Sequence, residues 1–175
     1  GYGCSKWFGY KKHYFNYDLT STQSSDLPQL FRDQLKFGSN KFLIDTISYK
    51  NEHNRDEPLN AHYHFNINSF ATEVGNDMFI NLQLNRLWYN DFLDTAMLKQ
   101  SRENDYPYQE KTITTLLIPD GYKVERVPQN SGWNSNNFSF SVSYSLTDTT
   151  ITATQKFSVS YLQLPFLMFE KRNEM

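Results

Sequence analysis

The chain has 175 residues, and 17 Lys and Arg against 19 Asp and Glu give it a formal net charge of −2. Proteins that bind nucleic acid through the phosphate backbone carry an excess of basic residues gathered into patches, so this balance argues against a nucleic-acid partner. The 14 Phe, 12 Tyr and 3 Trp far outnumber the four Ala. Because aromatic residues favour strands and Ala favours helices, the composition predicts a β-rich fold.

Three features of the sequence limit the class of protein further. No run approaches the roughly 18 apolar residues needed to cross a bilayer, so no membrane span is expected. Cys4 is the single cysteine, which makes an intramolecular disulfide impossible. The chain begins with Gly1 and without an apolar targeting segment, and we expect it to be a piece of a longer protein.

The first 40 residues predict short strands and then one helix. Residues 6–19 interleave aromatic side chains with Lys and His, which indicates one or two strands. A helix is predicted next, capped by Ser25 or Asp26 and ended by Gly38. Its apolar stripe, which we expect to face the neighbouring sheet, consists of Leu27, Leu30, Phe31 and Leu35.

From residue 41 the apolar pattern changes to a period of two, which is typical of strands. Residues 41–50 and 59–70 predict two strands joined by the polar loop 51–58. In the second strand, Ala61, Tyr63, Phe65 and Ile67 point to the core, and His62, His64, Asn66 and Asn68 point to solvent. A turn at residues 75–77 and a strand over residues 78–84 follow.

The second half of the chain predicts an antiparallel hairpin. Residues 85–109 show neither period and predict a long packed connection, and strands 111–118 and 122–127 flank a Pro119–Asp120–Gly121 turn. Aromatic or apolar residues alternate with serines without interruption over residues 138–146, and residues 151–161 supply the partner strand. The tail after Pro165 predicts the start of a helix. The predicted fold is mainly β, an antiparallel β-sandwich-like domain with one short N-terminal helix.

His62 and His64 are the candidate metal ligands. On a strand they project from one face, about 6 to 7 Å apart along the chain. A zinc site needs at least one further ligand, and the residues of suitable type, which are Cys4, His13, Glu52 and His53, lie at no recognised spacing. The pattern therefore favours two polar residues on a solvated face, and we expect no cofactor.

Enzymatic activity is not expected from these residues. Cys4 begins no convincing helix, whereas catalytic thiols usually lie at a helix N-terminus or beside a cation that lowers the thiol pKa. The sequence also contains no G-x-S-x-G, G-x-x-x-x-G-K or H-E-x-x-H string. Paired carboxylates from separate strands would leave no local motif, so they remain an open alternative.

The aromatic residues near predicted loops support two interpretations. Trp88, Trp133 and Tyr122 lie among Asn and Asp, a combination that stacks and hydrogen-bonds sugars or peptides. Alternatively, such rings fill a sandwich core and cover its open ends. We favour the core interpretation. If the aromatic residues instead bind a ligand, Trp88, Trp133 and Tyr122 are the candidate ligand-binding residues.

The order of several short motifs carries a family resemblance over roughly residues 25–165. First, a strand leads through a Gly turn to an apolar segment. Next comes an Arg that precedes a Tyr-Pro pair. The remaining motifs are a strand, a Pro-acidic-Gly-Tyr turn, a Val-Glu-x-x-Pro strand and a hairpin, in that order. The matching residues are Gly75, Arg102, Pro107, Pro119, Asp120, Gly121, Tyr122, Val124, Glu125 and Pro128. This arrangement resembles the uncharacterised C-terminal β-domain that follows a transglutaminase-like core in large exported proteins of Gram-negative bacteria.

The resemblance implies a non-catalytic accessory domain, periplasmic or at the cell surface, whose partner is a preceding transglutaminase-like domain of the same protein. It implies a β-sandwich-like domain over residues 38–175, with residues 1–37 as a strand and helix segment that connects from the preceding domain. No catalytic residue of that core is carried over, because Cys4 matches no such motif. The alternative is a glycan- or peptide-binding module that uses the loop aromatics.

Overall fold

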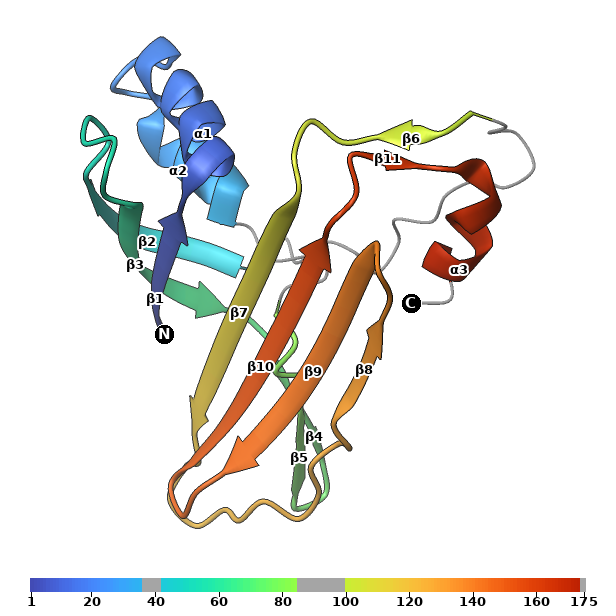
Figure 1. Cartoon of the computed structure of the whole chain (residues 1–175). Helices are drawn as coiled ribbons and strands as arrows, with labels where there is room; N and C mark the ends of the chain where they lie inside the picture. The colour runs from blue at the N-terminus through green and yellow to red at the C-terminus, as the bar shows by residue number, and fades with distance from the viewer. Residues whose placement is uncertain (36–41, 85–99, 174–175) are drawn as a thin grey trace. The chain divides into compact units, whose positions relative to one another are not determined.

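The computed structural model describes residues 1–35, 42–84 and 100–173 (Figure 1). The described residues are mainly β, and all of their strand pairs are antiparallel. The chain divides into two compact units, residues 1–80 and residues 81–175, each of which is described by itself. Within the described ranges, no helix has both the length and the apolar character needed to cross a membrane.

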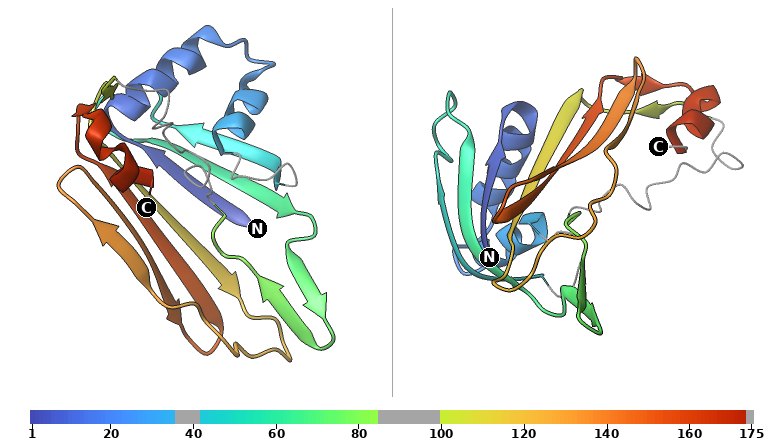
Figure 2. Two further views of the ribbon diagram at one scale, coloured as in Figure 1. Left: turned by 90° about the vertical axis from the view of Figure 1, so that its right-hand side faces the viewer. Right: turned by 90° about the horizontal axis from the view of Figure 1, so that it is seen from below.

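The first unit combines a three-stranded sheet with two helices and a small hairpin. The sheet has the order β1-β3-β2, and β4 pairs with β5 in a separate hairpin that extends from the end of β3 (Figure 2). The elements are β1 (Tyr2–Trp7), α1 (Gly9–Ser21), α2 (Leu27–Leu35), β2 (Phe42–Lys50), β3 (Leu59–Ile67), β4 (Ala71–Val74) and β5 (Asp77–Ile80).

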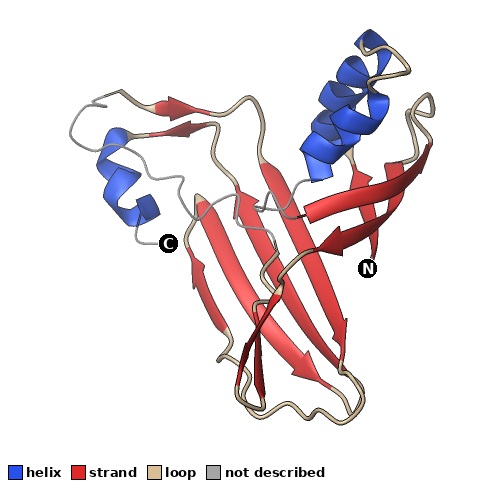
Figure 3. Cartoon of the chain, turned by 180° about the vertical axis from the view of Figure 1, so that it is seen from behind, coloured by secondary structure: helices blue, strands red, loops and turns tan. Residues whose placement is uncertain are grey.

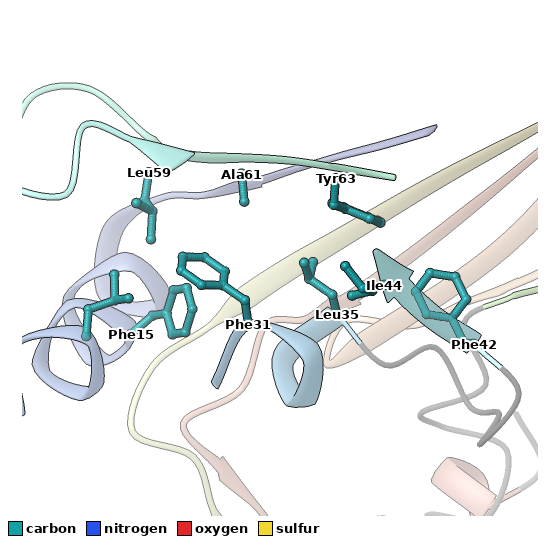
Figure 4. Packing of buried hydrophobic residues seen from close by; sticks show 9 residues of the cluster. Phe15, Phe31, Leu35, Phe42, Ile44, Leu59, Ala61 and Tyr63 are labelled. Carbon is teal, nitrogen blue, oxygen red and sulfur yellow. The ribbon is translucent and has the colours of Figure 1, made fainter. Parts of the chain in front are cut away.

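Both helices pack on the same face of this sheet. Figure 4 shows Phe31 of α2 and Tyr63 of β3 pointing into one apolar cluster. The cluster consists of Phe15, Leu19, Phe31, Leu35, Phe42, Ile44, Leu59, Ala61 and Tyr63. The predicted helix is confirmed as α2, and its stripe packs as expected, although its predicted end at Gly38 lies outside the described residues.

The predicted strands over residues 6–19 are wrong, because the chain forms a helix from Gly9. Lys12, Phe15 and Leu19 are buried at spacings of three and four, which is the helical period. Tyr10 and Tyr17 are exposed on the opposite side of α1. Aromatic side chains on both faces therefore concealed the period, and the prediction of a single N-terminal helix is wrong.

Two glycines permit β1 to pair with β3. Gly3 lies opposite Tyr63 in the register, and a Cβ atom added to Gly3 would overlap the Tyr63 ring. A Cβ on Gly1 would overlap Phe65 in the same way. The Tyr63 and Phe65 rings of β3 thus lie against the backbone at Gly3 of β1 and at Gly1 just before it, where a larger residue would require the rings to shift.

The second unit contains a four-stranded sheet of order β7-β10-β9-β8 and a short β11-β6 pair. Among its described residues strands predominate, and the helical turns η1 and α3 lie near the C-terminal end (Figure 3). The elements are β6 (Arg102–Glu103), β7 (Tyr108–Leu117), β8 (Ser131–Asn134), β9 (Phe138–Leu146), β10 (Thr150–Val159), β11 (Gln163–Leu164), the 3₁₀ helix η1 (Phe166–Met168) and α3 (Phe169–Asn173).

The hairpin predicted for the C-terminal half is confirmed as β9 and β10, and the predicted helix start after Pro165 is confirmed as η1 and α3. The apolar cluster of this unit contains Phe138, Phe157, Val159, Tyr161, Leu164 and Phe169. The predicted packed connection 85–109 lies largely outside the described residues, and the strand predicted over residues 78–84 ends at Ile80.

The turn after β7 is confirmed, but the strand predicted to follow it is wrong. The Tyr122 amide donates to the Pro119 carbonyl at 3.1 Å, and Gly121 adopts a left-handed φ of 85°. Residues 123–130 then form no strand. Val124 and Val127 are the half-buried residues of this stretch, and their spacing of three residues breaks the alternation that a strand requires.

The N-terminal segment belongs structurally to the first sheet. β1 pairs with β3 along its whole length, and α2 packs against β2. β1 and α2 therefore lie in the first compact unit, which ends at Ile80. The boundary predicted at residue 37 lies outside the described residues.

Candidate functional site

The two histidines predicted to share a face do so, and Tyr2 contacts both of them. Tyr2 lies opposite His64 in the register of β1 and β3, and Cys4 lies opposite His62. The Tyr2 hydroxyl is hydrogen-bonded to His62 Nδ1, and the Tyr2 ring meets the His64 ring edge-on with centroids 5.4 Å apart. Both imidazoles are thus engaged by a residue some 60 positions earlier in the chain.

This face does not assemble a metal centre from the residues that the structure describes. No group of three His, Cys, Asp or Glu side chains in those ranges has the arrangement of metal ligands. Cys4 is exposed beside the histidines. Tyr2 interacts with both histidine rings on this face of the sheet.

The opposite face of the same strands carries an ionisable side chain with an altered pKa. Burial raises the pKa of the Tyr63 hydroxyl, while a hydrogen bond with Ser5 opposes this effect to a smaller extent. Tyr63 is 4% exposed and faces the apolar cluster, which explains the penalty on its charged form. It is therefore a structural tyrosine.

A buried lysine fastens the loop between β2 and β3. Lys12 of α1 is 6% exposed, and its ammonium group donates to the backbone carbonyls of Asn54 and Glu57. Asn16, one turn later, donates from Nδ2 to the Glu52 carbonyl at 2.7 Å. These bonds tie a polar loop to the helix across more than 35 residues of sequence, and the carbonyls satisfy a charge that would otherwise be costly to bury.

The aromatic residues predicted near loops, Trp133 and Tyr122, differ in their exposure to solvent. Trp133 lies in β8, half-buried, and stacks on Phe138 with ring centroids 4.8 Å apart. Tyr122 lies in the turn after β7 and is 47% exposed. Trp88 falls outside the described residues. Trp133 therefore contributes to the second core, and the described residues do not bring it together with Tyr122 as a pair of exposed rings.

Most side chains on one face of the four-stranded sheet carry a hydroxyl, and two lysines lie among them. The register places Lys111 of β7 directly opposite Lys156 of β10, and Lys156 directly opposite Ser141 of β9. Both lysines are exposed. We call this surface the hydroxyl face; it consists of Gln109, Lys111, Ile113, Thr115 and Leu117 on β7, Thr150, Thr152, Thr154, Lys156 and Ser158 on β10, and Ser139, Ser141, Ser143 and Ser145 on β9.

The hydroxyl face has no acidic residue at any of these strand positions. Its hydroxyls interact with one another, as between Thr115 and Thr152 at 3.0 Å. The opposite face carries the apolar cluster, so the sheet separates an apolar side from a hydroxylated, positively charged side. The serines of β9 were recognisable in sequence as the solvent side of that strand, but the opposition of the two lysines depends on the β7–β10 register.

A second surface went unrecognised because the helix α1 was predicted as strands. Tyr10, His13, Tyr14 and Tyr17 recur at spacings of three and four residues and are all exposed. The His13 and Tyr14 rings meet edge-on at 6.0 Å. The spacing itself was the available signal, since it places these rings along one side of a helix.

Comparison with known proteins gives one result. A family model described as "Domain of Unknown Function with solved-structure structure" (DUF3858) matches residues 77–165. No curated protein and no solved structure matches the chain. The match runs from β5 to the residue after β11 and covers just over half of the chain. The chain therefore belongs to the DUF3858 family.

Proposed function

We propose that this chain is a non-catalytic accessory domain that follows a transglutaminase-like domain in a larger exported protein. The observation that carries the proposal is the DUF3858 match over residues 77–165, which overlaps the C-terminal part of the region that supplied the motif resemblance. All of the motif residues except Gly75 lie inside it. In this proposal the domain serves the larger protein through packing or binding rather than through chemistry of its own.

The placement of the motif residues supports a structural role for them. Pro119 and Gly121 form the turn after β7, and Arg102 lies in β6, opposite Leu164 of β11. A Pro-Asp-Gly turn fixes the exit of a long strand, which a scaffold domain requires. We further propose that antiparallel sheets of the protein pack face to face as a β-sandwich, since the four-stranded sheet has one apolar and one polar face.

The preceding domain can be tested by reading the coding sequence immediately upstream of Gly1. A transglutaminase-like domain in the same reading frame is the expected result. An upstream sequence that encodes a stop codon, or an unrelated fold, would contradict the proposal.

The non-catalytic role has a separate biochemical test. The chain alone is expected to release no ammonia from glutamine-containing peptides and to cleave no peptide bond, whereas a protein extended to include the upstream domain is the positive comparison. Turnover by the chain alone would contradict the assignment.

Export is tested by cell fractionation, with an antibody that detects the chain. The chain is expected in the periplasmic or surface fraction rather than in the cytoplasm.

A further inference from the structure

We propose that the hydroxyl face of the four-stranded sheet binds an acidic polysaccharide, with Lys111 and Lys156 together holding a carboxylate of the sugar chain. The proposal concerns residues that none of the motifs above includes, and it holds whichever domain precedes this one. It goes beyond an accessory role by naming a ligand class and a surface.

The first support is the direct opposition of two like charges. Lys111 and Lys156 are Cα partners in an antiparallel pair, so their side chains leave the same face of the sheet next to each other. Like charges in this position repel and destabilise the pair. An anion placed between two ammonium groups converts that repulsion into two favourable contacts.

The second support is the charge of the surroundings. No Asp or Glu shares this face of β7, β9 or β10, although the whole chain carries a net charge of −2. Within the described part of the chain, neither lysine forms an ion pair. The face is thus locally positive on a weakly acidic protein, and its charge is complementary to an anionic ligand.

The third support is the chemistry around the lysines. Ser141 of β9 lies directly opposite Lys156 in the register. On β10 itself, Thr154 and Ser158 lie two residues before and two residues after Lys156, on the same face. Each hydroxyl both donates and accepts, as sugar hydroxyls do. Strand residues on one face recur about every 6.7 Å, so the hydroxyls form a regular array rather than a single pocket, and an extended polymer can lie along it.

The fourth support is apolar contact in line with Lys111. Ile113 is 56% exposed and Leu117 is 72% exposed, and both project from the same face of β7. The C–H faces of pyranose rings can cover such side chains. A nucleic acid fits this surface less well, because its binding sites combine many basic residues with aromatic rings for stacking, and the hydroxyl face has two lysines and no aromatic residue.

The test uses the full chain and polygalacturonate as the acidic polysaccharide, with dextran as the neutral comparison, in affinity electrophoresis and calorimetry at low salt. Polygalacturonate is expected to retard the chain and dextran to leave it unretarded. The double variant Lys111→Gln/Lys156→Gln is expected to bind about tenfold more weakly or worse, since it loses two charge-assisted contacts. Higher salt is expected to weaken the binding of the unmodified chain.

A matched control removes the same charge elsewhere. Lys50→Gln/Lys123→Gln changes two exposed lysines outside the hydroxyl face and is expected to bind within about twofold of the unmodified chain. Ile113→Ser keeps both lysines and is expected to weaken binding of polygalacturonate. Circular dichroism of each variant verifies the fold, which substitutions at exposed positions leave intact.

Three results would overturn the proposal. The first is the absence of any retardation by polygalacturonate. The second is an equal loss of binding in the two double variants, which would make the effect one of net charge. The third is equal retardation by inorganic polyphosphate, which would show an anion site without recognition of sugar.

Discussion

Trp133 lies over Phe138 in a parallel stack, with ring centroids 4.8 Å apart and ring planes inclined by 20°. The two residues come from neighbouring antiparallel strands, and Phe138 is only 1% exposed. The indole therefore covers an aromatic ring at the centre of the second apolar cluster. Its position beside a core ring, rather than in an open loop, makes Trp133 an anchor of β8 on the sheet.

The substitution Trp133→Ala is expected to lower the free energy of unfolding by about 2 to 3 kcal/mol, because it removes the stack and exposes Phe138. Trp133→Phe should lower it by less than half of that amount. The measurement is urea denaturation followed by circular dichroism. Tyr122→Ala, at a position that is 47% exposed, is the control and should change the value by less than about 0.5 kcal/mol.

Much of the fold followed from sequence where one period dominated. Residues 138–146 alternate serine with apolar residues, which only a strand with one wet face produces, and β9 occupies that range. Residues 9–21 carry aromatic side chains on both sides of a helix, so the apolar period was lost there. The strand predicted over residues 122–127 is wrong, because its half-buried residues Val124 and Val127 are three positions apart and a strand requires a period of two.

The sequence predicted the candidate sites only where the alternation of a single strand determines which residues share a face. His62 and His64 had to share a face, but the contact with Tyr2 depends on the pairing of β1 with β3 across about 60 residues. The opposition of Lys111 and Lys156 likewise depends on a register that no local pattern specifies. Long-range register is set by the packing of whole strands, which a single sequence does not display.

The lysine pair predicts an increase in stability on removal of either charge. Lys111→Gln or Lys156→Gln is expected to raise the free energy of unfolding by about 0.2 to 1 kcal/mol at low salt, since like charges directly opposite each other repel. The double variant should gain no more than the better single variant, because one substitution already abolishes the repulsion.

Thermal or urea denaturation at low and high salt measures this effect, and the gain should shrink as salt screens the charges. Lys123→Gln, at an exposed position away from the sheet, should change stability little under both conditions. Simple additivity of the two single variants would contradict a direct interaction between Lys111 and Lys156.

Substitution of Lys12 is expected to destabilise the chain, unlike substitution of Lys111 or Lys156, because Lys12 is buried and hydrogen-bonded to backbone carbonyls. Lys12→Met is expected to lower the free energy of unfolding by about 2 kcal/mol, since the carbonyls of Asn54 and Glu57 lose a charged donor. The loop 51–58 should also become more susceptible to limited proteolysis. Lys6→Met, at an exposed position of β1, should leave both the stability and the cleavage rate unchanged. An unaltered cleavage rate in Lys12→Met would show that the loop is held by other contacts.

Tyr63 predicts a loss of stability at high pH. Burial raises its pKa in the folded chain above the ordinary value of 10.0, so between these two values the unfolded chain has released a proton that the folded chain still holds. The unfolded state is then favoured as the pH increases. The stabilising contribution is complete below pH 10 and is lost as the pH rises through 10.0 toward the folded pKa.

The variant Tyr63→Phe is expected to lose this part of the pH dependence. The other ionisable groups are common to both proteins, so the informative quantity is the difference in unfolding free energy between the variant and the unmodified chain. That difference should be constant at neutral pH and should shift in favour of Tyr63→Phe above pH 10. Tyr17→Phe, where the ring is 72% exposed, is the control for removal of a tyrosine hydroxyl outside the apolar cluster. Parallel curves for Tyr63→Phe and the unmodified chain above that pH would mean that the Tyr63 hydroxyl ionises in the folded chain as readily as it does in water.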